Sequence, residues 1–486
     1  MKNPIAFLFD KTETETHVPN RDILCHAVGL AGQNMTYGYT NGWWFLFCND
    51  ILHISPKQVG LMQSISKCWD AVNDPLIGSL VDRHRFKSGE KLRPYLIITP
   101  PFIGIFSMLM FMRFTSDTTA ALIIMFALYF FWDLTYSFQD TALWGILAVS
   151  SPHSQERSRV AQWISIGAGA GNALVGLFPM MKGENVLNAL RMTPAGMYML
   201  GGVIFGLGGE LISMAAYKQK ERISVPSQQG DSIKDIFYGL FQNRTLLLIS
   251  LARFLQQVTP VLDWEHFFVS SVSYDTGKFS IDGGTAQFLY GLLTGIPGSA
   301  CMFAAAKLAD KIGGMKKLLV ISQITAIVLR IAAYFVGFET LPKMIIVMLL
   351  ISIVQIPANS MDIAHRSLTS DSIDYVEWKT GIRNEGISFS VQNFISKMQS
   401  SASSLIKGLI LNALGYDSYT DKNKQNPVYM KWQWPIFMLG PVFGAVMYLI
   451  VISFIKDDRE MRDRVEKELA ERRAAGLKLS AADEEK

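Results

Sequence analysis

Long apolar stretches alternate with short polar segments along almost the whole chain. A helix needs about 20 apolar residues to cross the hydrocarbon core of a bilayer, and twelve stretches reach that length. The pattern therefore predicts an all-α integral membrane protein with twelve transmembrane helices, whose even number places both termini on one side. The predicted spans are residues 23–48, 59–81, 94–114, 118–149, 160–181, 194–217, 245–272, 284–309, 317–338, 343–368, 386–413 and 433–456.

Lysine and arginine gather in the loops after the second and eighth spans, whereas the loops after the first and ninth spans hold only Lys57 and Lys343. Because short cytoplasmic loops carry the excess of positive charge, both termini are predicted to be cytoplasmic. We expect an N-terminal segment, two pseudo-symmetric six-helix bundles joined by a cytoplasmic linker, and a charged tail that forms a solvated helix. Their boundaries are 1–22, 23–217, 218–244, 245–456 and 457–486.

Composition narrows the class of protein further. Half of the 486 residues are apolar and 18% are charged, which is typical of a membrane protein rather than of a soluble one. The net charge of +4 does not suggest a nucleic-acid partner, and the four cysteines have neither metal-binding nor paired spacing. The sequence has no zinc-protease, serine-hydrolase or phosphate-loop motif. We therefore expect neither enzymatic activity nor a cofactor.

The second span contains charged residues at positions inside the membrane, where most side chains are apolar. Lys67, Asp70, Asn73 and Asp74 are three or four residues apart and therefore share one helix face. A charge at mid-membrane costs roughly 2.5–3.5 kcal/mol, so such residues face a cavity, pair with one another or bind ions. The two carboxylates and the carboxamide are hard oxygen ligands that suit a small cation such as Na+, or a shared proton, and Lys67 can neutralise them when no cation is bound. The alternative is a structural salt-bridge face between helices.

The fourth span repeats this arrangement with Asp133, Ser137, Asp140 and Trp144, which again share one stripe. A carboxylate accepts hydrogen bonds from two hydroxyls, and an indole ring packs on the apolar face of a pyranose. Asp140 and Trp144 therefore indicate a sugar site, although an aromatic side chain in a helix seam is the simpler explanation for Trp144 alone.

Two further groups stand out. Lys397, with Gln392 and Asn393 in the same span, puts an ammonium group at membrane depth, for which we expect an acidic partner in the other half. Asp82 and Arg83 end the second span, and Asp310 and Lys311 end the eighth in the same position of its half. Such paired charges at the cytoplasmic ends could form ion pairs that break when the bundles move, and we assign them a gating role.

Several of these motifs resemble a known family. Residues 69–78 (WDAVNDPLIG), 89–95 (GEKLRPY) and 371–383 (DSIDYVEWKTGIR) are similar in order and spacing to the signature of the glycoside–pentoside–hexuronide:cation symporters. This is the melibiose-permease branch of the major facilitator superfamily. The resemblance extends over all twelve predicted spans and implies the major facilitator fold with sugar uptake coupled to Na+, Li+ or H+.

The resemblance also implies residue roles. The family's cation ligands fall on Asp70, Asn73, Asp74 and Ser137. Its sugar-binding Asp and Trp fall on Asp140 and Trp144, and its coupling lysine falls on Lys397. The remaining substrate positions fall on Gln33, Asn34, Gln392 and Asn393.

The substrate positions also depart from the melibiose permease. Asn34 stands where that permease has Asp, Gln33 where it has Lys, and Ser165 near its Arg. The coupling machinery is therefore retained better than the galactoside-specific positions, and a sugar other than melibiose is expected.

The sequence thus predicts a monomeric, multi-pass symporter of the cell membrane. Its expected partners are a sugar or glycoside, a monovalent cation and the lipid bilayer. Two other functions stay open: transport of a lipid-like amphipathic solute, and a membrane sensor that binds its ligand without moving it.

Overall fold

The computed structural model describes most of the chain and is almost entirely helical. Residues 1–17 of the predicted N-terminal segment (1–22), most of the predicted linker (223–242) and the last residues, 475–486, lie outside the described residues. Within some helices only the backbone is described. The described ranges are 18–87, 89–151, 153–222, 243–259, 262, 264–275, 280–302, 311–312, 314–380, 385–416, 425–455 and 459–474.

Two compact units make up the chain. Unit 1 consists of Met1–Gly230, Phe268–Phe288 and Leu411–Asn426. Unit 2 consists of Asp231–Phe267, Leu289–Ile410 and Pro427–Lys486. The predicted bundle boundaries at 23–217 and 245–456 stay a prediction.

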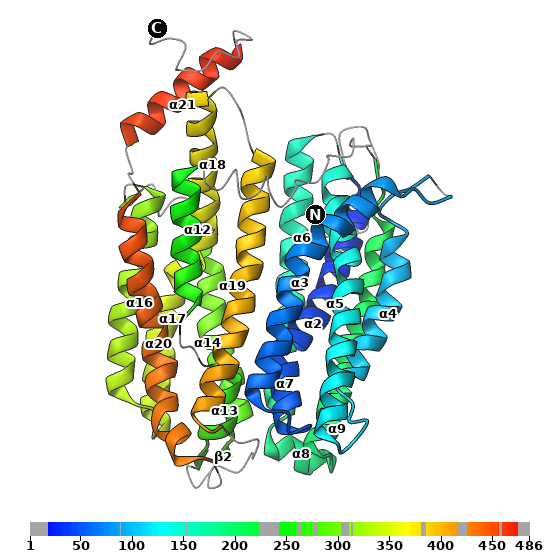
Figure 1. The fold of residues 1–486 in the computed structure, drawn as a ribbon, viewed down its shortest axis with the longest axis vertical. Coiled ribbons are helices and arrows are strands. Elements are labelled where there is room, and N and C mark those ends of the chain that lie inside the picture. The colour runs from blue at the N-terminus through cyan, green and yellow to red at the C-terminus, as the bar shows by residue number, and fades with distance from the viewer. Residues whose placement is uncertain are drawn as a thin grey trace, which may run out of the picture. The chain divides into compact units, whose positions relative to one another are not determined.

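The helices of unit 1 from α2 to α10 form a bundle of roughly parallel elements (Figure 1). Local signals start several of them: Ser55 and Gln58 form a capping box at α3, and Asp117 caps α5. The unit also includes a short antiparallel pair of strands, β1 (Tyr274–Asp275) and β2 (Ser280–Ile281). The helices are α2 (Asn20–Asp50), α3 (Pro56–Arg83), α4 (Tyr95–Leu109), α5 (Thr118–Val149), α6 (Ser154–Val175), α7 (Phe178–Met181), α8 (Glu184–Leu190), α9 (Pro194–Gly201), the π-helix η1 (Gly202–Leu207), α10 (Gly208–Ser213) and the 3-10 helix η2 (Met214–Lys218).

The helices of unit 2 follow the predicted spans with two differences. The predicted span 245–272 divides into one helix that ends at Gln257 and a second that begins at Trp264. The predicted span 343–368 covers one helix that ends at Ala358 and the start of a second. The helices are α12 (Arg244–Gln257), α13 (Trp264–Ser271), α14 (Gly283–Met302), α16 (Met315–Val336), α17 (Leu341–Ala358), α18 (Met361–Thr380), α19 (Glu385–Ala413), α20 (Pro427–Ser453) and α21 (Arg459–Ala474), of which α13, α14 and α19 extend into unit 1.

Six stretches of the described residues are long and apolar enough to cross a membrane by length and composition. The other predicted spans are shorter or more polar: α4 has 15 residues, and α3 carries the Lys67 to Asp74 group. The twelve-helix count and the orientation of the termini therefore stay predictions. The six stretches are Thr118–Val149, Glu156–Met181, Pro194–Lys218, Met315–Val336, Leu341–Lys379 and Pro427–Ser453.

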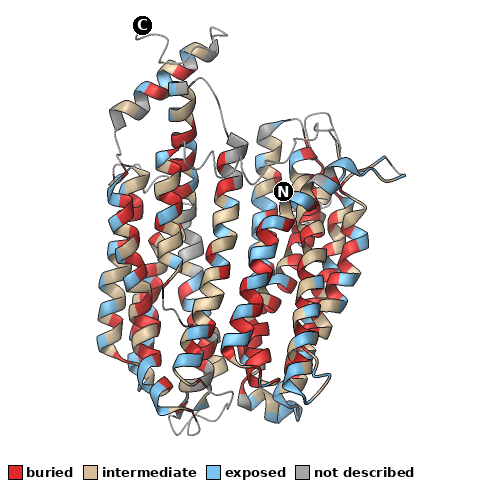
Figure 2. Cartoon of the chain, in the orientation of Figure 1, coloured by how far each residue is buried: buried red, intermediate tan, exposed pale blue. Residues whose placement is uncertain are grey.

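Burial follows the helix faces (Figure 2). A core in unit 1 centres on Leu30, Leu143 and Ile164, and one in unit 2 on Leu318 and Ile452. Many large apolar side chains are also exposed on the helices, Phe335 to 80%. Soluble proteins seldom expose so much large apolar surface, and lipid would cover it in a membrane.

The tail helix α21 packs on α18 of the same unit. Val465 and Leu469 are each 4% exposed, and Trp378 donates from Nε1 to Glu468 Oε2 at 2.6 Å. Hydrogen bonds from Arg464 and from Trp378 hold the pKa of Glu468 below its usual range. The predicted tail helix is therefore present, but one face of it is covered by protein rather than solvated.

Helices α2 and α6 approach each other more closely than side chains would allow. A Cβ atom on Gly167 would lie 2.0 Å from the Ala27 carbonyl oxygen, and one on Gly171 would lie 2.1 Å from that of Ala31. Gly169, between them on the same helix, has open space around it. Small residues at 167 and 171 thus let the two backbones touch.

We expect Gly171→Ala to lower the free energy of unfolding by about 1–3 kcal/mol, because the added methyl group forces two backbones apart. Gly169→Ala is the matched control, and it should be neutral or stabilising by up to about 1 kcal/mol, because alanine favours helix. Thermal unfolding of the purified variants in detergent would measure both. Equal effects at the two positions would contradict the close contact.

Candidate functional site

The polar face of α3 lies inside unit 1. Lys67, Asp70 and Asn73 are only 8%, 7% and 4% exposed, and Asp74 is half-buried. The spacing of three and four residues places them on successive turns of the helix. Three of the four residues predicted to share this face are therefore buried in unit 1, as a column of polar groups.

Lys67 lies among groups from three helices. It interacts electrostatically with Asp70 of its own helix, with Asp133 and Tyr129 of α5, and with Tyr37 of α2. Its Nζ atom lies 5.9 Å from the centre of the Tyr37 ring, within the range of a cation–π contact. The structure therefore brings the ammonium group to carboxylates of both α3 and α5. From the sequence, Asp133 was predicted only to share one face of the fourth span with Ser137, Asp140 and Trp144, and no role was assigned to it.

The predicted cation ligands are all oxygen donors, a set that suits Na+ or Li+. Ser137 is 7% exposed on α5, and the Asn73 Nδ2 atom is buried without a hydrogen-bond partner among the residues that the structure describes. No group of three His, Cys, Asp or Glu side chains that could hold a metal ion occurs within the described ranges. A cation here would therefore need the Asn73 or Ser137 oxygen besides the two carboxylates.

The substrate residues predicted in the first and fourth spans meet. Gln33 of α2, 1% exposed, donates from Nε2 to Asp140 Oδ1 of α5 at 2.8 Å. The Asn34 Oδ1 atom accepts a hydrogen bond of 3.1 Å from the Nδ2 of Asn172, an exposed residue of α6. A Cβ atom at Gly38 would lie 2.7 Å from Asn172 Oδ1, so the glycine leaves room for this side chain. Asn172 was not predicted, because only the folded structure brings α6 to Asn34.

Aromatic rings extend this polar patch. Tyr37 stacks on Tyr136 with ring centres 5.3 Å apart, and Tyr136 stacks on Trp132 at 5.1 Å. Tyr37 is 39% exposed and Trp144 is 46% exposed. Both rings are therefore accessible from outside unit 1, and Tyr37 is a second candidate platform for an apolar face of a ligand.

The predicted residues of α19 belong to unit 2. Gln392 donates from Nε2 to Thr369 Oγ1 of α18, Asn393 is exposed and Lys397 is half-buried. They share one stretch of α19, as the sequence predicts.

The predicted gating residues are only partly described. Asp82 lies in the last turn of α3, but its side chain lies outside the description, and Arg83 at the end of α3 is exposed. Asp310 lies outside the described residues, and Lys311 is exposed. The gating role of these residues stays a prediction.

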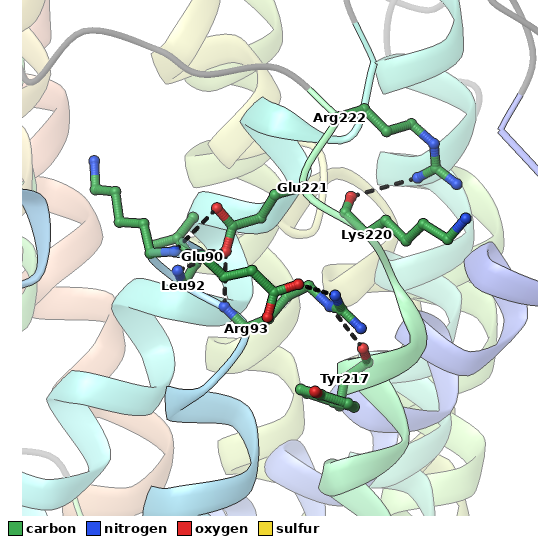
Figure 3. Close-up of polar contacts among 8 residues, drawn as sticks. Glu90, Leu92, Arg93, Tyr217, Lys220, Glu221 and Arg222 are labelled. Carbon is green, nitrogen blue, oxygen red and sulfur yellow. Dashed lines mark hydrogen bonds and ion pairs between the residues drawn. The ribbon is translucent and has the colours of Figure 1, made fainter. Parts of the chain in front are cut away.

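The loop before α4 is held by the start of the linker (Figure 3). Both Glu221 carboxylate oxygens accept from the backbone N–H of Lys91, and Oε1 also accepts from those of Leu92 and Arg93, at 2.6–3.2 Å. The Arg93 guanidinium donates from Nε to the carbonyl oxygen of Tyr217 at 3.0 Å and lies over its ring. Glu221 thus stabilises the backbone of residues 91–93, which directly precede the N-terminus of α4. A negative charge is favourable at a helix N-terminus.

Comparison with known proteins identifies the family. A family model described as MFS/sugar transport protein matches residues 25–458. The chain belongs to this family. The symporter YjmB of Bacillus subtilis is 23% identical over 458 residues, or 94% of this chain and 96% of the relative. The putative glycoside/cation symporter YagG of Escherichia coli is 24% identical over 472 residues, or 95% and 97%.

The solved structures show the same fold. A mutant of the nucleoside transporter NupG aligns with a TM-score of 0.63 at 13% identity, over 90% of this chain and 100% of that one. This member of the MFS/sugar transport protein family therefore has a helical major facilitator fold. It is a multi-pass membrane transporter and not an enzyme.

We expect Glu221→Gln to lower the apparent Tm, because a neutral amide replaces a carboxylate that accepts from three backbone amides. The loss should correspond to about 1–3 kcal/mol, the usual effect of a hydrogen bond to a charged group. Glu339→Gln is the control: its carboxylate pairs with Lys343 at 2.8 Å but is 63% exposed, and exposed pairs contribute little. An equal shift in both variants would contradict a stabilising role of Glu221.

Proposed function

We propose that this transporter is a cation-coupled symporter that carries a sugar or glycoside by alternating access. The observation that carries the proposal is the buried column of Lys67, Asp70 and Asn73 in unit 1, with Asp133 of α5 within electrostatic reach of Lys67. Groups of this kind are costly at membrane depth, and they mark ion and substrate pathways.

In this mechanism Asp70, Asn73, Asp74 and Ser137 bind the coupling ion, Na+, Li+ or H+. Lys67 neutralises the carboxylates in the absence of the ion. When the ion binds, it competes with the ammonium group for the carboxylate oxygens and lowers the net negative charge.

The substrate is bound by Gln33, Asn34, Asp140 and Trp144, together with Gln392 and Asn393 of α19. Asp140 accepts from substrate hydroxyl groups, and the Trp144 ring packs against the carbon face of the sugar. The bond between Gln33 and Asp140 orients the carboxylate, and Asn172 orients Asn34. Because carboxamides dominate this set, a neutral polyhydroxylated substrate fits it better than an anionic one.

Coupling joins the two sites. If the cation strengthens substrate binding by some factor, the substrate must strengthen cation binding by the same factor. Lys397 of α19 takes part in this coupling, and Asp82, Arg83, Asp310 and Lys311 open and close the cytoplasmic side as the bundles move.

The proposed architecture is a monomer of twelve transmembrane helices in the cell membrane, with both termini in the cytoplasm. The glycoside/cation symporter name of one relative supports the substrate class and the coupling. The apolar helix surfaces support the membrane location.

Asp70→Asn and Asp74→Asn should each reduce cation-stimulated uptake at least about tenfold, equivalent to about 1.4 kcal/mol, because a neutral amide binds a cation more weakly than a carboxylate does. Charge movement in proteoliposomes, on addition of glycosides, pentosides and uronides with and without sodium, measures this. Asp117→Asn is the matched control: it makes the same change at the exposed cap of α5 and should keep full activity.

Three results would argue against this proposal. Unchanged cation stimulation in both would contradict the proposed cation site. Saturable sugar binding without accumulation would indicate a sensor, and retention of lysolipid in place of sugar would indicate an amphipathic substrate.

Asp140→Asn should separate substrate binding from cation binding. The variant keeps an oxygen that can accept from Gln33 but loses the charge that binds hydroxyl groups, so KM for the sugar should rise about tenfold or more, equivalent to about 1.4 kcal/mol. Half-saturation by the cation, measured without sugar, should change far less. A larger effect on the cation than on the sugar would contradict the assignment of Asp140.

A further inference from the structure

A second buried acid lies in unit 1, apart from the polar column of α3. Glu210 of α10 is 0% exposed, and Gln139 of α5 is 1% exposed. The Gln139 Nε2 atom lies 2.6 Å from Glu210 Oε2 and 2.8 Å from Ser213 Oγ. The Ser213 hydroxyl oxygen lies 2.9 Å from the same carboxylate oxygen and 2.7 Å from the Glu210 carbonyl oxygen. The three side chains form one closed polar cluster.

Close backbone packing seals this cluster. A Cβ atom on Gly104 of α4 would lie 3.3 Å from Glu210 Cβ. A Cβ atom on Gly32 of α2 would lie 2.3 Å from the Gly209 carbonyl oxygen, next to the glutamate. Backbones at such separations leave no room for a water layer between the helices.

Two acceptor atoms of the cluster lack a donor. Glu210 Oε1 and Gln139 Oε1 are buried and have no hydrogen-bond partner among the described residues. An ionised Glu210 would therefore leave a carboxylate oxygen unpaired in the bundle interior, and the Gln139 oxygen as well. Each unsatisfied buried group costs about 1–3 kcal/mol, and more when it is charged.

Among the described residues, no positively charged group acts on Glu210. Its hydrogen-bond partners are Gln139 and Ser213, with the Thr36 hydroxyl of α2 also close, and the phenol of Tyr136 on α5 is within electrostatic reach. The side of α4 that faces it carries Gly104. None of these neighbours is a cation, and Tyr136 is the titratable group among them. An isolated buried carboxylate takes up a proton under such conditions.

A proton on Glu210 removes the buried charge and supplies a donor for the Gln139 oxygen. The amide of Gln139 can be turned by 180° without changing its shape, because its oxygen and nitrogen are nearly isosteric. In that orientation the Glu210 hydroxyl donates to the amide oxygen across the 2.6 Å contact, and Ser213 donates to the same oxygen across 2.8 Å. A separation of 2.6 Å is typical of O–H···O bonds and short for N–H···O bonds.

We propose that Glu210 is a proton-binding site, separate from the Asp70 and Asp74 site, and that it is protonated in this conformation. The neutral acid joins α10 to α5 through Gln139. Loss of the proton would leave a buried carboxylate with no cation beside it among the described residues, so we expect this contact to open to water when the proton leaves. Gln139 lies on the same helix as Ser137 and Asp140, so the proton acts on the helix that carries proposed ligands of both cation and sugar.

Infrared spectroscopy of the full-length protein in lipid nanodiscs tests this without any transport assay, so it can fail independently of the proposed function. At neutral pH the wild-type protein should show the C=O stretching band of a protonated, buried carboxylic acid. Glu210→Gln should remove that band, whereas the control Glu339→Gln, which changes an exposed carboxylate, should keep it. A band unchanged in Glu210→Gln would overturn the proposal.

Stability gives a second measurement. A neutral amide replaces a neutral acid in Glu210→Gln, so its apparent Tm should stay near that of the wild type, while Glu210→Ala should lower it by leaving a cavity and an unpaired amide. Equal losses in both variants would contradict a neutral Glu210.

Gln139→Leu keeps the test available if the glutamate variants do not fold. It removes the hydrogen-bond acceptor, so the acid band should persist and shift to higher frequency. Absence of an acid band in both the wild type and Gln139→Leu would show an ionised Glu210 and overturn the proposal.

Discussion

Charge inside an apolar bundle has to be neutralised by a neighbouring helix or by a proton, and the polar structure of unit 1 follows from this constraint. Lys67 meets the acids Asp70 and Asp133, one from its own helix and one from α5. Glu210 has no cation among its described neighbours, which is why we propose a proton there. The same bundle thus combines a lysine close to two carboxylates with an acid for which we propose the neutral form, and α5 contributes to both.

Helical periodicity predicted much of what a single helix determines. The offsets between Lys67, Asp70 and Asn73 were sufficient to predict their common buried face, because side chains three and four residues apart overlie one another. The ends of most helices lie within a few residues of the apolar stretches. One exception, at 343–368, arose because hydropathy continues through the turn between α17 and α18, where α17 ends at Ala358 with Asn359 as its C-cap.

Contacts between helices could not be predicted in the same way. Gln139 and Glu210 are 71 residues apart, and Asn34 and Asn172 are 138 apart, so no local pattern relates them. A signal did exist for Glu210, a lone acid in the apolar stretch 194–217. The sequence alone could not show which groups of other helices lie next to this acid. Whether a cation is among the described neighbours decides whether such an acid is ionised.

The hydrogen bonds from Glu221 to the loop before α4 constrain which sequence changes this loop can accept during evolution. Its carboxylate binds main-chain amides of residues 91–93 and not their side chains. Replacement of a side chain within 91–93 by any residue other than proline therefore leaves these amides in place, although a change at Arg93 also removes the contact of its guanidinium with Tyr217. Insertion or deletion of one residue moves the amides out of reach. The loop should accordingly accept substitutions far more readily than changes in its length.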